Sequence, residues 1–133
     1  MLIYRFIGDL IDFTEAASRG DKECYSLQIE KNTYIDIVAP GCYANHSCEP
    51  NAGIRNTVEL VALTDIHPGV EIRFDYSTTM DEDYYTMDCR CGCQSCRKTV
   101  TDFKLLPPET RATYLRQGIV MDFIAKQYAL AVQ

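Results

Sequence analysis

Residues 89–96 of this sequence read Cys-Arg-Cys-Gly-Cys-Gln-Ser-Cys, a density of thiols that indicates metal binding. Cys89, Cys91 and Cys96 have a C-x-C-x4-C spacing, which allows three thiolates to surround one cation. A closed tetrahedral zinc site needs a fourth ligand, so one more sulfur must come from elsewhere in the chain. Cys48, within the segment Asn-His-Ser-Cys-Glu-Pro-Asn, is the candidate.

The other cysteines leave alternatives open. Cys93 lies inside the C-x4-C gap and could replace Cys91 or Cys96 as a ligand. Cys24 and Cys42 are expected to pack as small apolar side chains. The chain has 7 cysteines, and several of the clustered ones are too close in sequence to form disulfides with one another. We therefore expect a reducing, intracellular compartment, cytoplasmic or, in a eukaryote, nuclear, with redox sensing as a secondary alternative.

The overall composition predicts one soluble domain. Of the 133 residues, 47% are hydrophobic and 24% charged, and no apolar run approaches the roughly 20 residues that a membrane-spanning helix needs. The first residues carry Arg5 and Asp9 without a small-residue cleavage site, so we interpret them as a strand rather than a secretory signal. The formal net charge of -6 argues against direct nucleic acid binding and favours a basic partner.

Acidic side chains are concentrated between residues 74 and 88, where the sequence has no Lys or Arg. Such a run is usually a solvated loop. Its position between the two cysteine-bearing segments favours a surface that attracts a cationic peptide. The carboxylates are those of Asp75, Asp81, Glu82, Asp83 and Asp88.

The pattern of apolar residues predicts short strands first and helices last. Residues 31–32 are expected to form a hairpin turn, and residues 77–88 a polar loop. One helix opens at residues 107–108 and is interrupted at Gly118, after which an apolar stripe of helical period predicts an amphipathic helix. The predicted strands, which are rich in aromatic and β-branched residues, are 2–7, 25–29, 34–38, 57–63 and 70–74.

Three segments, in this order, resemble the motifs of the SET-domain protein lysine methyltransferases with a post-SET zinc motif. Residues 45–51 match N-H-S-C-x-P-N, and residues 69–76 match G-E-E-L-x-F-D-Y. Residues 89–96 match the post-SET C-x-C-x4-C, and residues 6–9 resemble the family's Y-x-G-E strand. The likeness extends from about residue 2 to residue 132.

This resemblance implies a fold. We expect a mainly β (α+β) SET-type β-clip, in which the N-H-S-C segment is threaded through a later loop as a pseudoknot. A post-SET zinc loop and C-terminal helices follow. Residues 1–88 would form an N-terminally short SET domain, and residues 89–133 would form the zinc segment and helices of the same compact unit. The implied zinc ligands are Cys48, Cys89, Cys91 and Cys96.

The resemblance also implies an activity, the S-adenosylmethionine-dependent methylation of lysine side chains in a basic protein or peptide, histone-like or other. Methyl transfer is an in-line displacement, so the donor and a neutral lysine amine must be aligned in a dry channel. Phenylalanine at position 74 implies room for di- or trimethylation. The implied roles are catalysis for Tyr76, walls of the substrate channel for Phe74 and Tyr25, and cofactor binding for Asn45 and His46.

Departures from the family motifs support an alternative hypothesis. No Gly-rich G-x-G strand precedes Phe6, so we expect missing N-terminal strands, either encoded upstream of Met1 or replaced by a partner or a second copy in a homodimer. Phe6 also replaces the tyrosine of Y-x-G, for which Tyr25 or Tyr43 could compensate, and residues 42–44 replace R-F-I. The alternative is a catalytically incomplete SET module that acts as a zinc-stabilised peptide-binding or scaffolding domain. A plain zinc-ribbon interaction domain would leave the N-H-S-C and F-D-Y segments unexplained.

Overall fold

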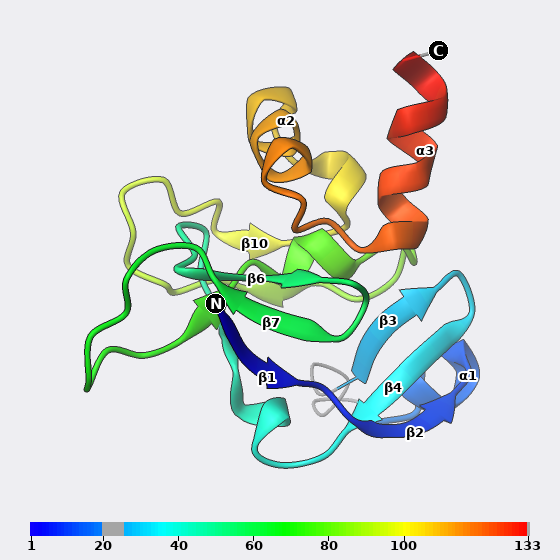
Figure 1. Cartoon of the computed structure of the whole chain (residues 1–133). Helices are drawn as coiled ribbons and strands as arrows, with labels where there is room; N and C mark the ends of the chain where they lie inside the picture. The colour runs from blue at the N-terminus through cyan, green and yellow to red at the C-terminus, as the bar shows by residue number, and fades with distance from the viewer. Residues whose placement is uncertain (20–25, 133) are drawn as a thin grey trace.

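The computed structural model describes residues 1–19 and 26–132. Within this part of the chain, short strands form two three-stranded sheets and two two-stranded pairs, and the two longest helices come last (Figure 1). The predicted mainly β, α+β architecture is therefore confirmed. In chain order the elements are β1 (Leu2–Arg5), β2 (Gly8–Ile11), α1 (Phe13–Ala17), β3 (Ser26–Glu30), β4 (Thr33–Ile37), η2 (Gly41–Tyr43), β5 (Asn45–His46), β6 (Ala52–Arg55), β7 (Glu59–Ala62), β8 (Arg73–Phe74), η3 (Tyr76–Thr79), β9 (Met87–Asp88), β10 (Thr99–Val100), η4 (Phe103–Leu105), α2 (Pro108–Gln117) and α3 (Asp122–Val132).

Both three-stranded sheets are antiparallel. In one sheet β7 lies between β1 and β6, and in the other β4 lies between β2 and β3. The predicted hairpin is confirmed, because β3 and β4 pair across the turn at residues 31–32. The strands predicted at residues 57–63 and 70–74 are confirmed in shorter form as β7 and β8. They belong to different sheets, because β8 pairs with β5.

The pairing of β5 with β8 brings the N-H-S-C and F-D-Y segments together. The two strands are parallel, with Asn45 opposite Arg73 and His46 opposite Phe74. Asn51 extends the contact with its side chain, since Asn51 Oδ1 accepts a hydrogen bond from the Arg73 backbone N–H at 2.9 Å. This pairing is the contact that the predicted pseudoknot requires.

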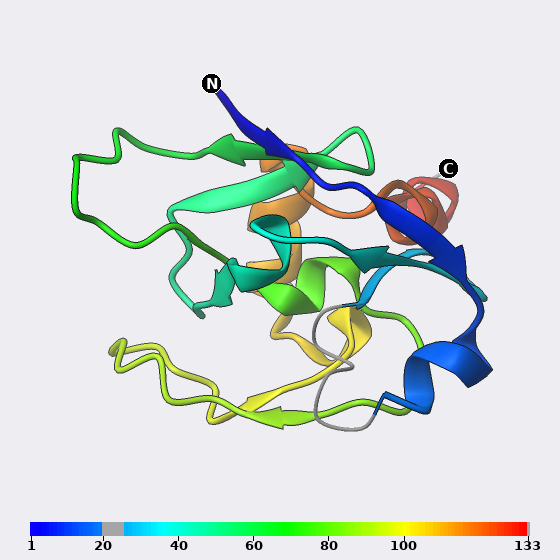
Figure 2. The ribbon, with the colours of Figure 1, turned by 90° about the horizontal axis from the view of Figure 1, so that it is seen from below.

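Residues 77–80, expected to belong to a polar loop, are buried instead. Most of them belong to η3, which lies between the sheet of β1, β7 and β6 and the pair of β9 and β10 (Figure 2). The hydroxyl of Thr78 donates to the Asp75 carbonyl at 2.8 Å, and that of Thr79 donates to the Tyr76 carbonyl at 3.1 Å. Because the turn satisfies its own polar side chains, they can be buried at little cost.

The main hydrophobic core lies between the sheets and the C-terminal helices. Gly53 in β6 approaches Ile119 so closely that a Cβ at this position would come within 2.6 Å of the Ile119 side chain. No helix in the described part of the chain has the length and apolar character needed to cross a membrane. The largest buried apolar side chains of this core include Phe6, Ile35, Ile54, Phe74, Phe103, Ile119 and Met121.

Helix α2 follows the predicted limits. It begins at Pro108 and is terminated by Gly118, whose φ of 70° is the left-handed conformation that glycine adopts readily. On its inner side, the buried Tyr114 hydroxyl donates to Asp75 Oδ2 at 2.8 Å, and burial raises the pKa of this hydroxyl. This bond joins α2 to the residue that follows β8.

We expect Tyr114→Phe to lower the free energy of unfolding by about 1.5 to 3 kcal/mol, because a buried carboxylate loses a hydrogen-bond donor. Urea denaturation of the full chain measures this change. Tyr128→Phe on α3 is the matched control, since the Tyr128 ring packs against Phe103 and its hydroxyl has no hydrogen bond among the described residues. Equal effects of the two substitutions would contradict the assignment.

Candidate active site and metal centre

The sulfur atoms of four cysteines converge beside η3. Cys48, Cys89, Cys91 and Cys96 have Sγ atoms that all lie within 4.8 Å of one another, and those of Cys48 and Cys89 are 3.7 Å apart. Four thiolates bound to one zinc ion at about 2.3 Å lie about 3.8 Å from each other. The cluster therefore has the ligand type, number and spacing of a tetrahedral zinc site, and it unites the four predicted ligands.

The other cysteines lie outside this cluster. Cys93 Sγ is 3.3 Å from the Ser47 hydroxyl and 3.9 Å from the Cys91 carbonyl, and it does not belong to the group of four sulfurs. The geometry thus favours Cys91 and Cys96 over Cys93 as ligands. Cys42 is half-buried, and Cys24 lies outside the described residues.

The surroundings of Cys48 and Cys91 shift the pKa values of their thiols in opposite directions. Burial raises the pKa of the Cys48 thiol to about 12, although the Arg97 backbone N–H, 3.3 Å from its sulfur, acts in the opposite direction. Desolvation also raises the pKa of Cys91, but backbone hydrogen bonds outweigh it and bring this pKa to about 6. Because metal binding requires thiolates, loading the cluster releases the proton of Cys48.

Tyr76, the predicted catalytic residue, is held by contacts of its hydroxyl, its backbone and its ring. Its hydroxyl donates to the Ala44 carbonyl at 2.6 Å, and its backbone N–H donates to His46 Nδ1 at 3.0 Å. Its ring packs against the Phe74 ring, with centroids 4.9 Å apart. The structure therefore places Tyr76 between the N-H-S-C segment and the predicted channel residue Phe74.

His46 connects Tyr76 to the metal centre. Since Nδ1 accepts the Tyr76 N–H, the imidazole proton is on Nε2, which lies 3.5 Å from Cys48 Sγ. Burial lowers the pKa of His46 despite the attraction of Asp75 nearby, so the ring is neutral. The His46 side chain is thus used within the protein, and its backbone remains for the predicted contact with a cofactor.

A hollow of about 390 Å³ lies beside the metal centre. Asn45, His46 and Tyr76 line it, together with cysteines of the cluster. Asn45 Nδ2 donates to Glu71 Oε2 at 3.4 Å, so the amide of Asn45 is held at the rim of this hollow. The structure therefore unites the two predicted cofactor-binding residues with Tyr76 in one cavity. The other lining residues are Glu71, Arg73, Met87, Cys89, Arg90 and Cys91.

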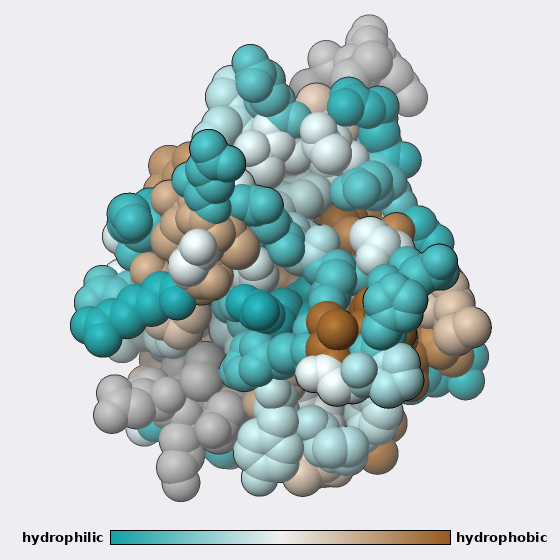
Figure 3. Space-filling view, turned by 90° about the vertical axis from the view of Figure 1, so that its left-hand side faces the viewer, coloured by the Kyte–Doolittle hydropathy of each residue, from teal (hydrophilic) through white to brown (hydrophobic). Residues whose placement is uncertain are grey.

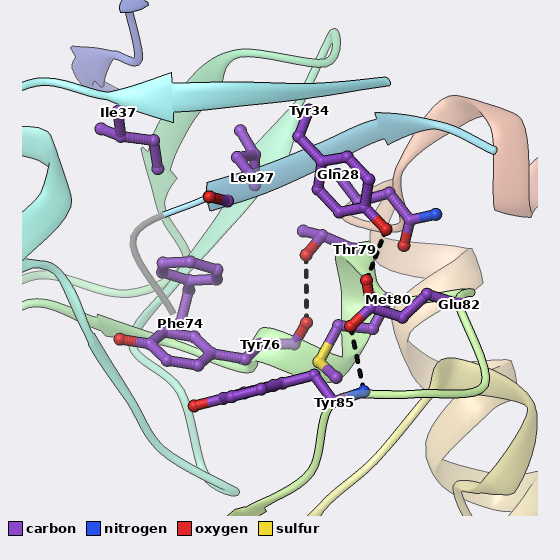
Figure 4. A pocket seen from close by; sticks show the side chains of 11 residues that line it. Leu27, Gln28, Tyr34, Ile37, Phe74, Tyr76, Thr79, Met80, Glu82 and Tyr85 are labelled. Carbon is purple, nitrogen blue, oxygen red and sulfur yellow. Dashed lines mark hydrogen bonds between the residues drawn. The ribbon is translucent and has the colours of Figure 1, made fainter. Parts of the chain in front are cut away.

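A second, narrower pocket of about 40 Å³ also has Tyr76 in its wall (Figure 4). Phe74 and Leu27 form part of its apolar wall, and among the described residues Tyr76 is the one that lines both cavities. Tyr25, predicted as a channel residue, lies outside the described residues. The other residues in the wall are Ser26, Gln28, Tyr34, Ile37, Thr79, Met80, Glu82 and Tyr85.

Glu82 and Tyr85 are wall residues that the sequence analysis missed. Glu82 accepts hydrogen bonds from the Tyr34 hydroxyl and, at 3.2 Å, from the Tyr85 backbone N–H. Burial raises the pKa of Glu82, whereas these hydrogen bonds lower it. The acidic run was expected to be either a solvated loop or a peptide-attracting surface, and its members differ: Asp75 is fully buried, while Asp83 and Asp88 are exposed.

The match to the SET domain family covers residues 1–77, more than half of the chain. The chain belongs to the SET-domain family. This match contains β1 to β8 and ends just after Tyr76. The boundary between a SET domain of residues 1–88 and a zinc segment with helices of residues 89–133 stays a prediction.

Curated relatives of this SET domain are histone-lysine N-methyltransferases. One, specific for lysine 36 of H3, from Candida albicans, is 33% identical over 138 residues, which cover 85% of this chain and 16% of the relative. Another, ASHH2 of Arabidopsis thaliana, is 28% identical over 112 residues, which cover 71% of this chain and 6% of the relative. The chain thus spans less than a fifth of the length of either relative.

Solved SET structures share the fold. The methyltransferase domain of human SETMAR superposes with a TM-score of 0.59 at 24% identity, covering 76% of this chain and 49% of that one. KRYPTONITE, solved with mCHH DNA, an H3(1-15) peptide and SAH, has a TM-score of 0.56 at 23% identity and covers 75% of this chain and 24% of its own. The predicted SET fold is confirmed.

We expect reduced protein to contain about one zinc ion per chain, because four sulfurs already have the spacing of a tetrahedral site. Removal of zinc with a chelator should lower the melting temperature by about 5 °C or more, since the cluster joins distant segments. Metal analysis and thermal melting measure both quantities. A content below about half an ion per chain would contradict a zinc site.

Two serine variants distinguish the ligand sets. Cys96→Ser should lose most of the bound zinc, because it removes one of four ligands. Cys93→Ser should retain it, since the Cys93 sulfur lies beside Ser47 and outside the cluster. If Cys93→Ser loses as much zinc as Cys96→Ser in metal analysis, the ligand set has been assigned incorrectly.

Proposed function

We propose that this chain transfers methyl groups from S-adenosylmethionine to lysine side chains of a basic protein or peptide. The position of Tyr76 between the two cavities carries the proposal. An in-line transfer needs a donor on one side and an acceptor on the other side of the reacting carbon, and Tyr76 borders a space for each. SUVH6 of Arabidopsis thaliana, another SET neighbour, was solved with SAM, which supports the choice of donor.

S-Adenosylmethionine would supply an electrophilic methyl group on a positively charged sulfur. The Tyr76 hydroxyl directs its proton to the Ala44 carbonyl, so its oxygen is the acceptor for an approaching amine. Phe74 and Leu27 give the narrow pocket apolar walls that exclude water. In such surroundings a lysine side chain loses its proton more readily, because burial disfavours the charged form. The pocket thus both aligns the amine and favours the neutral form that can react.

Charge supports a basic substrate. The formal net charge of the chain is -6, and Asp83 and Asp88, on the segment that borders the narrow pocket, are exposed. Figure 3 shows the face that carries the loops between β7 and β8 and between β9 and β10, where hydrophilic side chains cover most of the surface. The H3 peptide in the KRYPTONITE structure and the H3 specificity of the Candida albicans relative support a histone-like peptide. We propose such a peptide as the substrate, with Phe74 allowing di- or trimethylation.

One observation favours the alternative, a SET module that binds a peptide without methylating it. The narrow pocket has a volume of about 40 Å³, whereas the hollow beside the metal centre has about 390 Å³. Phe6, which replaces the family's tyrosine, packs 6.2 Å from the Phe74 ring and adds no hydroxyl. Turnover therefore requires this pocket to widen around the lysine. A homodimer and an intracellular location stay predictions from the sequence.

We expect Tyr76→Phe to lower the rate of methyl transfer about 100-fold or more, because the hydroxyl that orients the amine is lost. The assay uses radiolabelled S-adenosylmethionine and a mixture of basic proteins, with zinc-loaded full chain. Tyr128→Phe, on α3 and outside both cavities, is the control and should retain activity. Unchanged turnover in Tyr76→Phe would exclude this role. Binding of a basic protein by a wild-type chain that transfers no methyl group would instead support the alternative.

A further inference from the structure

Arg97 immediately follows the last cysteine of the metal cluster and makes contacts at both ends. Its backbone N–H donates to Cys48 Sγ at 3.3 Å. Its guanidinium Nη2 donates to Asp75 Oδ1 at 2.8 Å and lies 3.4 Å from the Ser77 hydroxyl. One residue therefore connects the metal centre to the carboxylate that directly precedes Tyr76.

The ion pair of Arg97 and Asp75 is buried. The Arg97 side chain is 16% exposed and that of Asp75 is 0% exposed. Removing either partner of such a pair leaves a buried charge without compensation, which is strongly unfavourable. Arg97 Nε is also buried without a hydrogen-bond partner among the described residues. In this position the guanidinium donates a hydrogen bond to Asp75, while its own Nε–H has no acceptor among the described residues.

Asp75 transmits this position to Tyr76. Its carboxylate accepts the Ser77 N–H at 3.0 Å and caps η3, the short helix that Tyr76 begins. A cap of this kind fixes the backbone conformation of the first turn, to which Tyr76 belongs. Because the same Oδ1 also accepts from Arg97, a shift of the guanidinium would shift the cap and the tyrosine with it.

We propose that Arg97 is a positioning residue for Tyr76: through Asp75, it sets the tyrosine side chain between the two cavities once the four-cysteine cluster has closed. This inference rests on the proposed methyl transfer. It gives a route by which the state of the metal centre would affect the position of Tyr76. Closing the cluster fixes Cys48 and Cys96, and these residues fix the backbone from which the guanidinium extends.

Arg97→Ala in the zinc-loaded full chain tests the proposal. We expect kcat to fall about tenfold or more, because a charge-assisted bond to a buried carboxylate is lost, whereas the zinc content and the KM for the peptide stay unchanged. Millimolar guanidinium should restore part of kcat in Arg97→Ala and none in Arg97→Lys, whose ammonium blocks the space. Lys98→Gln is the matched control: it removes a positive charge from an exposed neighbour and should behave like the wild type.

A second readout does not depend on turnover. The Tyr76 backbone amide, which donates to His46 Nδ1, should exchange its hydrogen faster in Arg97→Ala, and guanidinium should slow this exchange again. Unchanged kcat and amide exchange in Arg97→Ala would overturn the proposal. So would a loss of kcat that follows a loss of zinc and is not restored by guanidinium, since this is the result expected of a purely structural ion pair. If the wild type transfers no methyl group, the proposed function fails, and amide exchange still decides whether Arg97 positions Tyr76.

Discussion

The carboxylate of Asp75 is enclosed by protein on all sides, and donors from its own turn and from two distant parts of the chain converge on it. They are the Ser77 N–H in η3, the Arg97 guanidinium beyond the cysteine cluster and the Tyr114 hydroxyl in α2. Taking a carboxylate out of water costs several kcal/mol unless such donors replace the lost solvent. The turn, the cysteine segment and the helix are therefore held together by the requirement to satisfy one charge.

The ring of Tyr76 divides the space that the fold leaves near this carboxylate. On the side of Asn45 the space is wide and partly polar, and on the side of Phe74 it is narrow and apolar. Such an unequal division would suit a large polar donor in the wide cavity and a thin aliphatic acceptor chain in the narrow one. The chemistry expected of the SET family thus follows from where one ring lies as much as from the hydroxyl it carries.

Local sequence signals predicted the parts of the fold that depend on neighbouring residues. The hairpin of β3 and β4, the start of α2 and its end at Gly118 were predicted correctly. Counting zinc ligands called for one more sulfur, and the family resemblance assigned it to Cys48. Strand β6 was missed, since Ala-Gly-Ile-Arg has no strand pattern and acquires its conformation by pairing with β7. The turn at residues 77–80 was predicted to be a polar loop because its residues are mostly Ser and Thr. The sequence does not show that the hydroxyls of Thr78 and Thr79 donate to backbone carbonyls three residues earlier, which allows their burial. The contact of Arg97 with Asp75 depends on the tertiary fold, so no local pattern could indicate it.

The parallel pairing of β5 with β8 has a consequence for the order of events during folding. Cys48 lies just after β5, whereas its cluster partner Cys89 is 41 positions away in sequence, beyond β8. Contacts between such distant segments form late, because the entropy of closing long loops must be overcome first. Cys89, Cys91 and Cys96, in contrast, are near neighbours and can capture a metal ion in the unfolded chain. A newly made chain could therefore carry zinc on three sulfurs before the sheet exists, and arrival of the fourth sulfur would mark the moment at which the two halves of the candidate site meet.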